Sequence, residues 1–234
     1  MLFLIIQTVI ILYIIFAIYS IIEIKKYNKN GLIVDLNNDN DNNIKVELLS
    51  LNPILLHKNV NVDSEYLLKN YSNIMINNNE NFISIKNLFQ NDTINIFKNK
   101  NILKDTDLKD KINFDMDIFE NLPLPILLYQ EHSLSFLKGE QIISKQFCKH
   151  NINILIILEG EITIYLINPK HKDDIMNKDL QSIKKYSHKY ILKKDDVFII
   201  PPNWYYFEEN TNNLTIQYHI DASNIFTFHY NYLR

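Results

Sequence analysis

The stretch ILKKDDVFIIPPNWYY, residues 191–206, predicts a corner of a β-structure. Two short apolar runs are separated by Asp195 and Asp196, and aspartate accepts the backbone of a tight turn more readily than most residues. Pro201 and Pro202 end the second run, because proline cannot donate a hydrogen bond to a neighbouring strand. We therefore expect two strands joined by a tight turn at the corner of a barrel.

Similar short β-branched or aromatic runs, separated by polar or proline-containing turns, fill the second half of the chain. Strands at this spacing are typical of a β-sandwich or barrel. The expected strands are Ile142–Phe147, Ile152–Leu158, Ile162–Asn168, Lys189–Leu192, Val197–Ile200, Leu214–Ile220 and Ile225–Tyr232. The first half mixes short elements, with an expected strand at Pro53–His57 and a helix at Ser64–Tyr71. The sequence thus predicts a mainly β fold with a few short helices, of the α+β class.

The N-terminus predicts a membrane anchor. No charged side chain occurs between Met1 and Ile22, and about 20 apolar residues are enough for a helix to cross the hydrocarbon core. A signal peptide and a buried core helix are the alternatives, although the usual small-residue cleavage pattern is missing near Ala17. Lys25, Lys26 and Lys29 follow the apolar run, so the positive-inside rule predicts a single-pass membrane protein whose C-terminal domain is cytoplasmic.

Three segments follow from these patterns. Residues 1–24 form the expected transmembrane anchor helix, and residues 25–47 form a polar linker rich in asparagine and aspartate. Residues 48–234 remain for one domain, which is long enough for one sizeable core.

Composition excludes several classes of protein. The chain has 24 Lys+Arg against 27 Asp+Glu, so no strong positive field is available to bind nucleic acid. Three glycines are too few for the glycine-rich loops that bind nucleotides. The lone Cys148 fits a reducing compartment. Abundant isoleucine, asparagine and lysine indicate an AT-rich genome, as in some protists or giant DNA viruses.

Three segments together resemble the cupin-like, JmjC-type fold of the 2-oxoglutarate oxygenases. They are NILIILEGEITIYLINP at 153–169, the stretch 191–206 quoted above, and NLTIQYH at 213–219, and they occur in the family's order. The resemblance implies that residues 48–234 form a double-stranded β-helix, the cupin or jelly-roll barrel.

The same resemblance implies an iron site, since this family holds Fe(II) on two histidines and one carboxylate. The family's spacing places these ligands at Phe147, Lys149 and Tyr206, and none of these residues is a histidine or a carboxylate. The basic residue that binds the keto acid falls at Ile162. Shifting the register to Gln146 and Cys148, or to Cys148 and His150, restores no His-x-Asp pair. The vestigial ligand pocket is expected to comprise Asn153, Ile162, Trp204, Tyr206 and Tyr218.

Other candidate residues have ordinary explanations. The seven histidines lack the spacing of a metal motif, and His150 and His219 are the least improbable alternative ligands because both lie in the expected barrel segments. Cys148 is more often a semi-buried small apolar residue than a nucleophile in such a context.

Two functional hypotheses remain. The favoured one is a membrane-anchored, catalytically inactive cupin-like domain that needs no cofactor and acts as a binding or scaffold module, with an unknown protein or small molecule as partner and homodimerisation possible. The alternative is an Fe(II)/2-oxoglutarate-dependent hydroxylase with ligands from His150, His219 and an unidentified carboxylate. A weaker third reading is a metal-free cupin that binds a small molecule or sugar.

Overall fold

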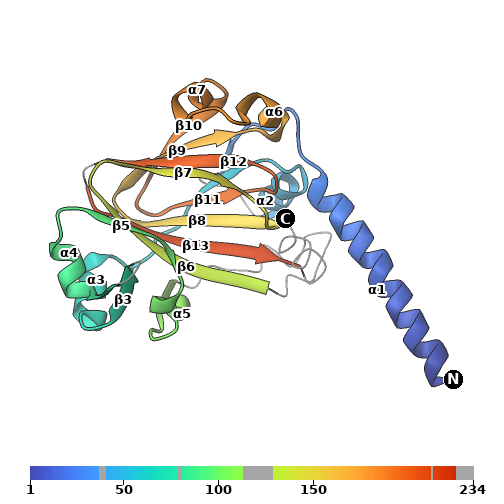
Figure 1. The fold of residues 1–234 in the computed structure, drawn as a ribbon, viewed down its shortest axis with the longest axis horizontal. Helices are drawn as coiled ribbons and strands as arrows, with labels where there is room; N and C mark the ends of the chain where they lie inside the picture. The colour runs from blue at the N-terminus through green and yellow to red at the C-terminus, as the bar shows by residue number, and fades with distance from the viewer. Residues whose placement is uncertain (37–40, 79–80, 113–128, 212, 225–234) are drawn as a thin grey trace.

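The computed structural model describes residues 1–36, 41–78, 81–112, 129–211 and 213–224. Two antiparallel sheets face each other, small helices lie at their margins, and a long N-terminal helix projects away from them (Figure 1). The predicted mainly β class with a few helices is confirmed. The expected strand Ile225–Tyr232 lies outside the described residues.

The larger sheet has seven strands in the order β1-β2-β11-β8-β13-β6-β5. All pairs in it are antiparallel except β1 with β2. The strands are β1 (Val34–Asp35), β2 (Ile54–His57), β5 (Ile94–Asn99), β6 (Tyr129–Lys138), β8 (Ile152–Glu159), β11 (Asp196–Ile200) and β13 (Thr215–Ser223).

The smaller sheet has four antiparallel strands in the order β10-β9-β12-β7, and a separate hairpin pairs β3 with β4. The strands are β3 (Met75–Asn78), β4 (Asn81–Ser84), β7 (Gln141–Phe147), β9 (Glu161–Ile167), β10 (Ser187–Lys193) and β12 (Tyr205–Asn210). The consecutive pairs β6–β7, β8–β9, β10–β11 and β12–β13 each pass from one sheet to the other. The chain therefore winds around the space between the sheets.

The turns carry the backbone conformations that such crossings need. Asp195 lies between β10 and β11 with φ of 74°, which confirms the predicted tight turn at Asp195 and Asp196. Gly160, between β8 and β9, has φ of 78°, and a Cβ there would collide with the carbonyl oxygen of Leu214. Glycine is required at Gly160 for both reasons.

The helices are short apart from the first. They are α1 (Leu2–Lys25), α2 (Asp41–Leu49), α3 (Ser64–Tyr71), α4 (Ile85–Gln90), α5 (Leu108–Ile112), α6 (Lys172–Ile175) and α7 (Leu180–Lys184), with 3-10 turns η1 (Asn101–Leu103) and η3 (Pro169–His171). Helix α3 has the predicted bounds and is capped by Asp63, whose carboxylate accepts from the backbone N–H of Tyr66.

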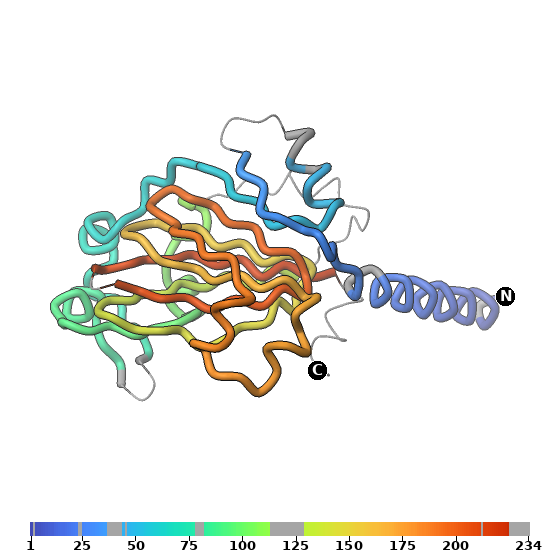
Figure 2. The backbone as a smooth tube through the Cα atoms, turned by 90° about the horizontal axis from the view of Figure 1, so that it is seen from above, coloured from blue at the N-terminus to red at the C-terminus, as the bar shows by residue number. Residues whose placement is uncertain are grey.

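Helix α1 meets the requirements for a membrane span. Its segment Phe3–Ile22 has a mean hydropathy of 2.5, and 6% of it is buried within the molecule. In Figure 2 the helix extends from one end of the sandwich into open space. A core helix would be largely buried by the rest of the molecule, and this one is not. A signal sequence, however, would share the same length and composition.

The expected polar linker, residues 25–47, is partly structured. Val34 and Asp35 form β1, which pairs with β2, and Ile44 of α2 is buried in the core together with Leu36. The asparagine-rich composition predicts a solvated linker, but these few apolar residues pack against the domain. Part of the predicted linker therefore belongs to the folded domain.

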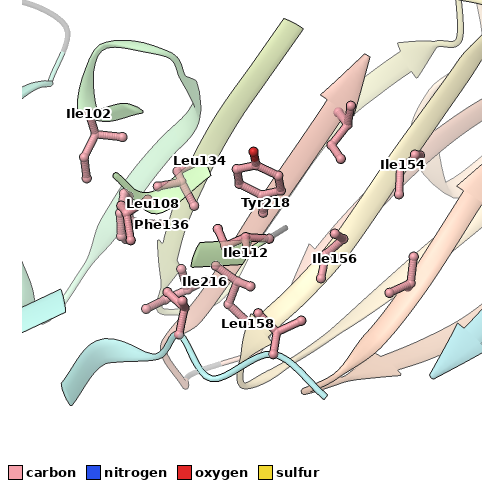
Figure 3. Close-up of a cluster of buried hydrophobic side chains, with 14 of the residues drawn as sticks. Ile102, Leu108, Ile112, Leu134, Phe136, Ile154, Ile156, Leu158, Ile216 and Tyr218 are labelled. Atoms are coloured by element: carbon pink, nitrogen blue, oxygen red, sulfur yellow. The ribbon is translucent and has the colours of Figure 1, made fainter. Parts of the chain in front are cut away.

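Two apolar clusters lie on opposite faces of the larger sheet. The outer cluster fills the face covered by the helices, and Figure 3 shows part of it. Its strand residues include Leu134, Phe136, Ile152, Ile154, Ile156, Leu158, Val197, Ile199, Ile216, Tyr218 and Ile220. The inner cluster lies between the sheets and includes Leu137, Ile143, Cys148, Leu155, Ile157, Ile162, Ile164, Leu166, Leu192, Phe198, Ile200, Trp204 and Tyr206.

Candidate functional site

Polar side chains are buried beside the inner apolar cluster. On β13, Gln217, His219 and Asp221 alternate with the outer-cluster residues Ile216, Tyr218 and Ile220, so they face the space between the sheets. We call the set of buried or half-buried polar residues around them the inner polar cluster. Its members are Lys98, Ser135, Asn153, Glu208, Gln217, His219 and Asp221.

Lys98 enters this cluster from a bulge in the edge strand β5. Its backbone has φ of 50°, and the pairing register with β6 shifts between Ile96 and Asn99. The Lys98 Nζ lies 2.8 Å from Asp221 Oδ2, and the amide of Asn153 donates to Asp221 Oδ1 at 2.5 Å. Burial raises the pKa of Asp221, but the attraction and hydrogen bond of Lys98, together with the attraction of His150 and His219, bring this pKa below its usual value. The ion pair therefore keeps a buried carboxylate charged.

His219, two residues before Asp221 on β13, is neutral. Its Nε2 lies 2.8 Å from Ser135 Oγ, which also accepts from the backbone N–H of Lys98 at 2.9 Å. The ring of Phe97 meets the imidazole edge to face, with centroids 5.5 Å apart. Burial lowers the pKa of His219 to about 3, and nearby Lys98 adds to this effect.

Glu208 and Gln217 join the two sheets. The Gln217 amide on β13 donates to Glu208 Oε2 on β12 at 2.9 Å, and both side chains are fully buried. Their remaining oxygens, Oε1 of each, have no hydrogen-bond partner in the part of the chain that is described. Burial raises the pKa of Glu208 to about 7. A protonated Glu208 would donate from Oε1 to Gln217, so a neutral acid satisfies both groups at once.

The predicted ligand positions do not converge. Phe147 pairs with Tyr205 across β7 and β12, and their rings lie 4.7 Å apart. Tyr205 packs with the outer residues of the smaller sheet, whereas Tyr206 belongs to the inner apolar cluster. Phe147 thus lies on the opposite face of the sheet from Tyr206, and Lys149 is exposed in the loop after β7.

The inward positions on this strand are one residue away from those predicted. Tyr206 pairs with Gln146, and Cys148 is 1% exposed within the inner apolar cluster. A shift of one residue exchanges the two faces of a strand, which explains the difference. Gln146 and Cys148 offer no His-x-Asp pair either. Burial raises the pKa of Cys148 well above its usual value, so its thiol is not activated.

The expected vestigial pocket is split between two faces. Ile162, Trp204 and Tyr206 belong to the inner apolar cluster and are at most 3% exposed, but Ile162 pairs with Asn210 at the opposite end of β12 from Trp204. Asn153 belongs to the inner polar cluster. Tyr218 was wrongly grouped with them, because it points into the outer cluster, where its hydroxyl lies 2.7 Å from His132 Nδ1 (Figure 3).

The alternative ligands are engaged separately. His150 Nδ1 lies 2.9 Å from Ser223 Oγ, whereas His219 contacts Ser135. Asp221 is the carboxylate that both histidines influence electrostatically. Within the described residues, however, no group of three or more His, Cys, Asp and Glu side chains could hold a metal ion. The described side chains therefore do not fit the iron implied by the cupin-like oxygenases.

Sequence reasoning missed Lys98, Glu208, Gln217 and Asp221. Alternation in TIQYHIDAS, residues 215–223, was a usable signal, because a polar residue at every second position of a strand lies on one face.

A polar cleft opens on the surface beside Lys98. It has a volume of about 360 Å³ and is lined by residues of β5 and its neighbours, namely Asn77, Asn95, Ile96, Phe97, Lys98, Asn99, Lys100 and Asn101. The lysines here are paired, Lys98 with Asp221 and Lys100 with Glu131, so the cleft does not present two unpaired cations.

Comparisons with known proteins return cupin domains. No protein-family model and no curated protein matches the sequence. The Schizosaccharomyces pombe Cnp3 cupin domain is similar at 20% identity over 42% of this chain and 58% of that one, with a TM-score of 0.32. A cupin superfamily protein from Desulfitobacterium hafniense aligns at 15% identity over 41% and 68%, with a TM-score of 0.30. The Drosophila melanogaster CENP-C cupin domain aligns at 14% identity over 39% and 59%, with a TM-score of 0.29.

The chain spans less than two thirds of the length of the first and third of these structures. These structures are cupin domains, and the likeness concerns the fold alone.

Proposed function

We propose that this chain is a membrane-anchored cupin-like module that binds a partner and carries out no iron chemistry. In this proposal the two sheets close as a double-stranded β-helix, α1 anchors the domain on the cytoplasmic side of a membrane, and a protein, a small molecule or a second copy of the chain is bound. JmjC-type catalysis is lost through replacement of the ligands.

One observation carries the loss of iron chemistry. The residues at the family's ligand positions, Phe147, Lys149 and Tyr206, supply no histidine or carboxylate, and two of them lie outside the space between the sheets. The inward residues Ile162 and Tyr206 are buried among apolar neighbours. A densely packed interior leaves no open coordination positions for oxygen and a keto acid.

Metal analysis tests this part of the proposal. The full chain is purified anaerobically in detergent, its iron is quantified, and its melting temperature is measured with and without Fe(II) and 2-oxoglutarate. We expect substoichiometric iron and an unchanged melting temperature, because a ligand that binds only the folded state would raise it. Stoichiometric iron, or a rise of several degrees that needs both additions, would establish the oxygenase alternative instead.

Anchoring is tested separately. Membranes from cells expressing the full chain are extracted with alkaline carbonate, and protease is added to intact vesicles of known orientation. We expect the chain to stay in the pellet at its full length, with the domain digested from the cytoplasmic side. Release into the supernatant, or shortening by about 20 residues at the N-terminus, would identify α1 as a peripheral helix or a cleaved signal.

A further inference from the structure

The segment that follows α1 is hydrogen-bonded to one end of the sandwich. The amide of Asn203 donates to the carbonyl oxygen of Lys26 at 3.3 Å, and the amide of Asn168 donates to that of Asn28 at 3.0 Å. The backbone at Gly31 also abuts Trp204, since a Cβ added there would lie 3.1 Å from the indole ring. We call residues 26–31 the juxtamembrane turn. These contacts hold the juxtamembrane turn, which directly follows α1, against the end of the sandwich.

The fastened end is formed by three loops of the sandwich. Residues 148–151 follow β7, residues 168–172 follow β9, and residues 201–204 precede β12. The backbone N–H of Asn203 donates to the carbonyl of Cys148 at 2.9 Å, which joins two of these loops. Figures 1 and 2 show α1 leaving from this end, with α3 and α4 at the opposite one.

Exposed lysines surround the juxtamembrane turn. Lys149 follows Cys148, and Lys170 and Lys172 lie within four residues of Asn168; all three are exposed and form no ion pair among the described residues. Lys25, Lys26 and Lys29 add further positive charge in the chain.

Among the described residues, acidic side chains at this end are fewer than the lysines, and they include Glu47, which accepts from the Asn52 amide that is itself bonded to Asn28. Helix α6 contributes Asp173 and Asp174, and Asp174 is paired with His171 at 3.1 Å. Glu23 lies in the last turns of α1. The lysines therefore leave an excess of positive charge where the domain meets the end of the membrane helix.

We propose that this end of the sandwich lies on the surface of the membrane that α1 spans, where Lys149, Lys170 and Lys172 bind the head groups of anionic phospholipids. The inference rests on the proposed anchoring by α1. Anionic head groups attract lysines close to the bilayer, and salt screens this attraction beyond about 8 Å. The fastened turn keeps the lysine-bearing loops near the bilayer.

This orientation restricts where a partner protein binds. The end that carries Trp204 and residues 148–151 faces lipid, so a partner in the cytoplasm meets the sides of the sandwich or the end formed by α3 and α4.

Amide hydrogen exchange of the full chain in lipid nanodiscs tests the proposal. The chain is reconstituted into phosphatidylcholine alone and into phosphatidylcholine with one third phosphatidylserine. We expect exchange in peptides covering 148–151 and 168–172 to slow with phosphatidylserine by about fivefold per lysine engaged. High salt, or the variant K149Q/K170Q/K172Q, should abolish the difference between the two lipids.

A matched variant controls for net charge. K69Q/K86Q/K193Q removes three exposed lysines from the opposite end and should keep the full effect of phosphatidylserine. Equal exchange in both lipids, or loss of the effect in both triple variants, would overturn the docking proposal. Failure of the chain to remain in nanodiscs after carbonate treatment would instead overturn the anchoring on which it rests.

Discussion

The two faces of β13 are equally buried and chemically opposite. The outer face presents Ile216, Tyr218 and Ile220 to a continuous apolar cluster, whereas the inner face presents Gln217, His219 and Asp221 to the space between the sheets. Each inner residue has a partner from another strand, namely Glu208, Ser135 and Lys98. The outer face is stabilised because its apolar surface is removed from water. The stability of the inner face depends on how many of its buried polar groups have a hydrogen-bond or ion-pair partner.

The comparison also shows how polar side chains can be accommodated in the buried space between two sheets. A buried polar group without a partner costs free energy, and a buried unpaired charge costs more. The inner polar cluster limits both costs by pairing one lysine with one carboxylate and by keeping Glu208 and His219 neutral, although Asn153 Oδ1 has no hydrogen-bond partner among the described residues. Four substitutions test this contrast between the faces.

The largest effect is expected from K98M, which removes one half of the buried ion pair. Asp221 would then be an uncompensated charge, and we expect a loss of about 4 kcal/mol in the free energy of unfolding. Chemical denaturation of the full chain in detergent measures it. The double variant K98M/D221N should recover much of the loss, because the remaining amide is neutral; equal losses in the single and double variants would show that the pair is not coupled.

On the outer face, I156A should cost about 3 kcal/mol through lost burial and a cavity. Because no titratable group is removed, the loss should be the same at pH 5 and pH 8. Denaturation at both pH values measures it. A loss that changed with pH would mean that the two faces are not independent.

E208Q should change the pH dependence of stability. The pKa of Glu208 is raised from 4.5 to about 7 in the folded chain, so between these values the folded state holds a proton that the unfolded state has lost. This stabilising contribution is complete below pH 4.5 and declines by about 3 kcal/mol as the pH rises to 7. Glutamine can make both hydrogen bonds to Gln217 without ionising.

We therefore expect E208Q to match the unmodified chain near pH 4.5 and to be more stable by up to about 3 kcal/mol at pH 8. Thermal unfolding followed by fluorescence of the single Trp204 across this pH range gives the difference. A constant difference at every pH would show that folding does not raise the pKa of Glu208.

Y218F should have the smallest effect, about 1 kcal/mol, because it removes one hydrogen bond to His132 and leaves the ring in the outer cluster. The same denaturation experiment measures it. A loss above about 3 kcal/mol would indicate that Tyr218 belongs to a polar site and not to the apolar face.

The sequence predicted most strands of the second half of the chain, including β13 with its polar inner face, and missed two. The predicted runs at 152–158 and 197–200 correspond to β8 and β11, and Asp195 lies in the predicted tight turn between β10 and β11. Strand β6 was missed because YQEHSLSFLK places serine and histidine among its apolar residues, and β12 was missed because YYFEEN contains two glutamates.

The candidate site was less predictable for a related reason. Counting from Asn153 gave the distance along the chain to Phe147, but the face on which a residue lies depends on register, and one residue reverses it. The ion pair of Lys98 with Asp221 joins residues 123 positions apart through a bulge. No local pattern specifies such a contact.

The protonation of Glu208 tests most directly whether the space between the sheets is a closed, self-paired interior. The full chain, labelled with ¹³C at glutamate carboxyl groups, is examined by NMR at pH 6, and the Glu208 signal is assigned by its absence in E208Q. We predict the chemical shift of a neutral carboxylic acid. The shift of an ionised carboxylate at pH 6 would contradict the account, because it would indicate an interior open to water or to a cation.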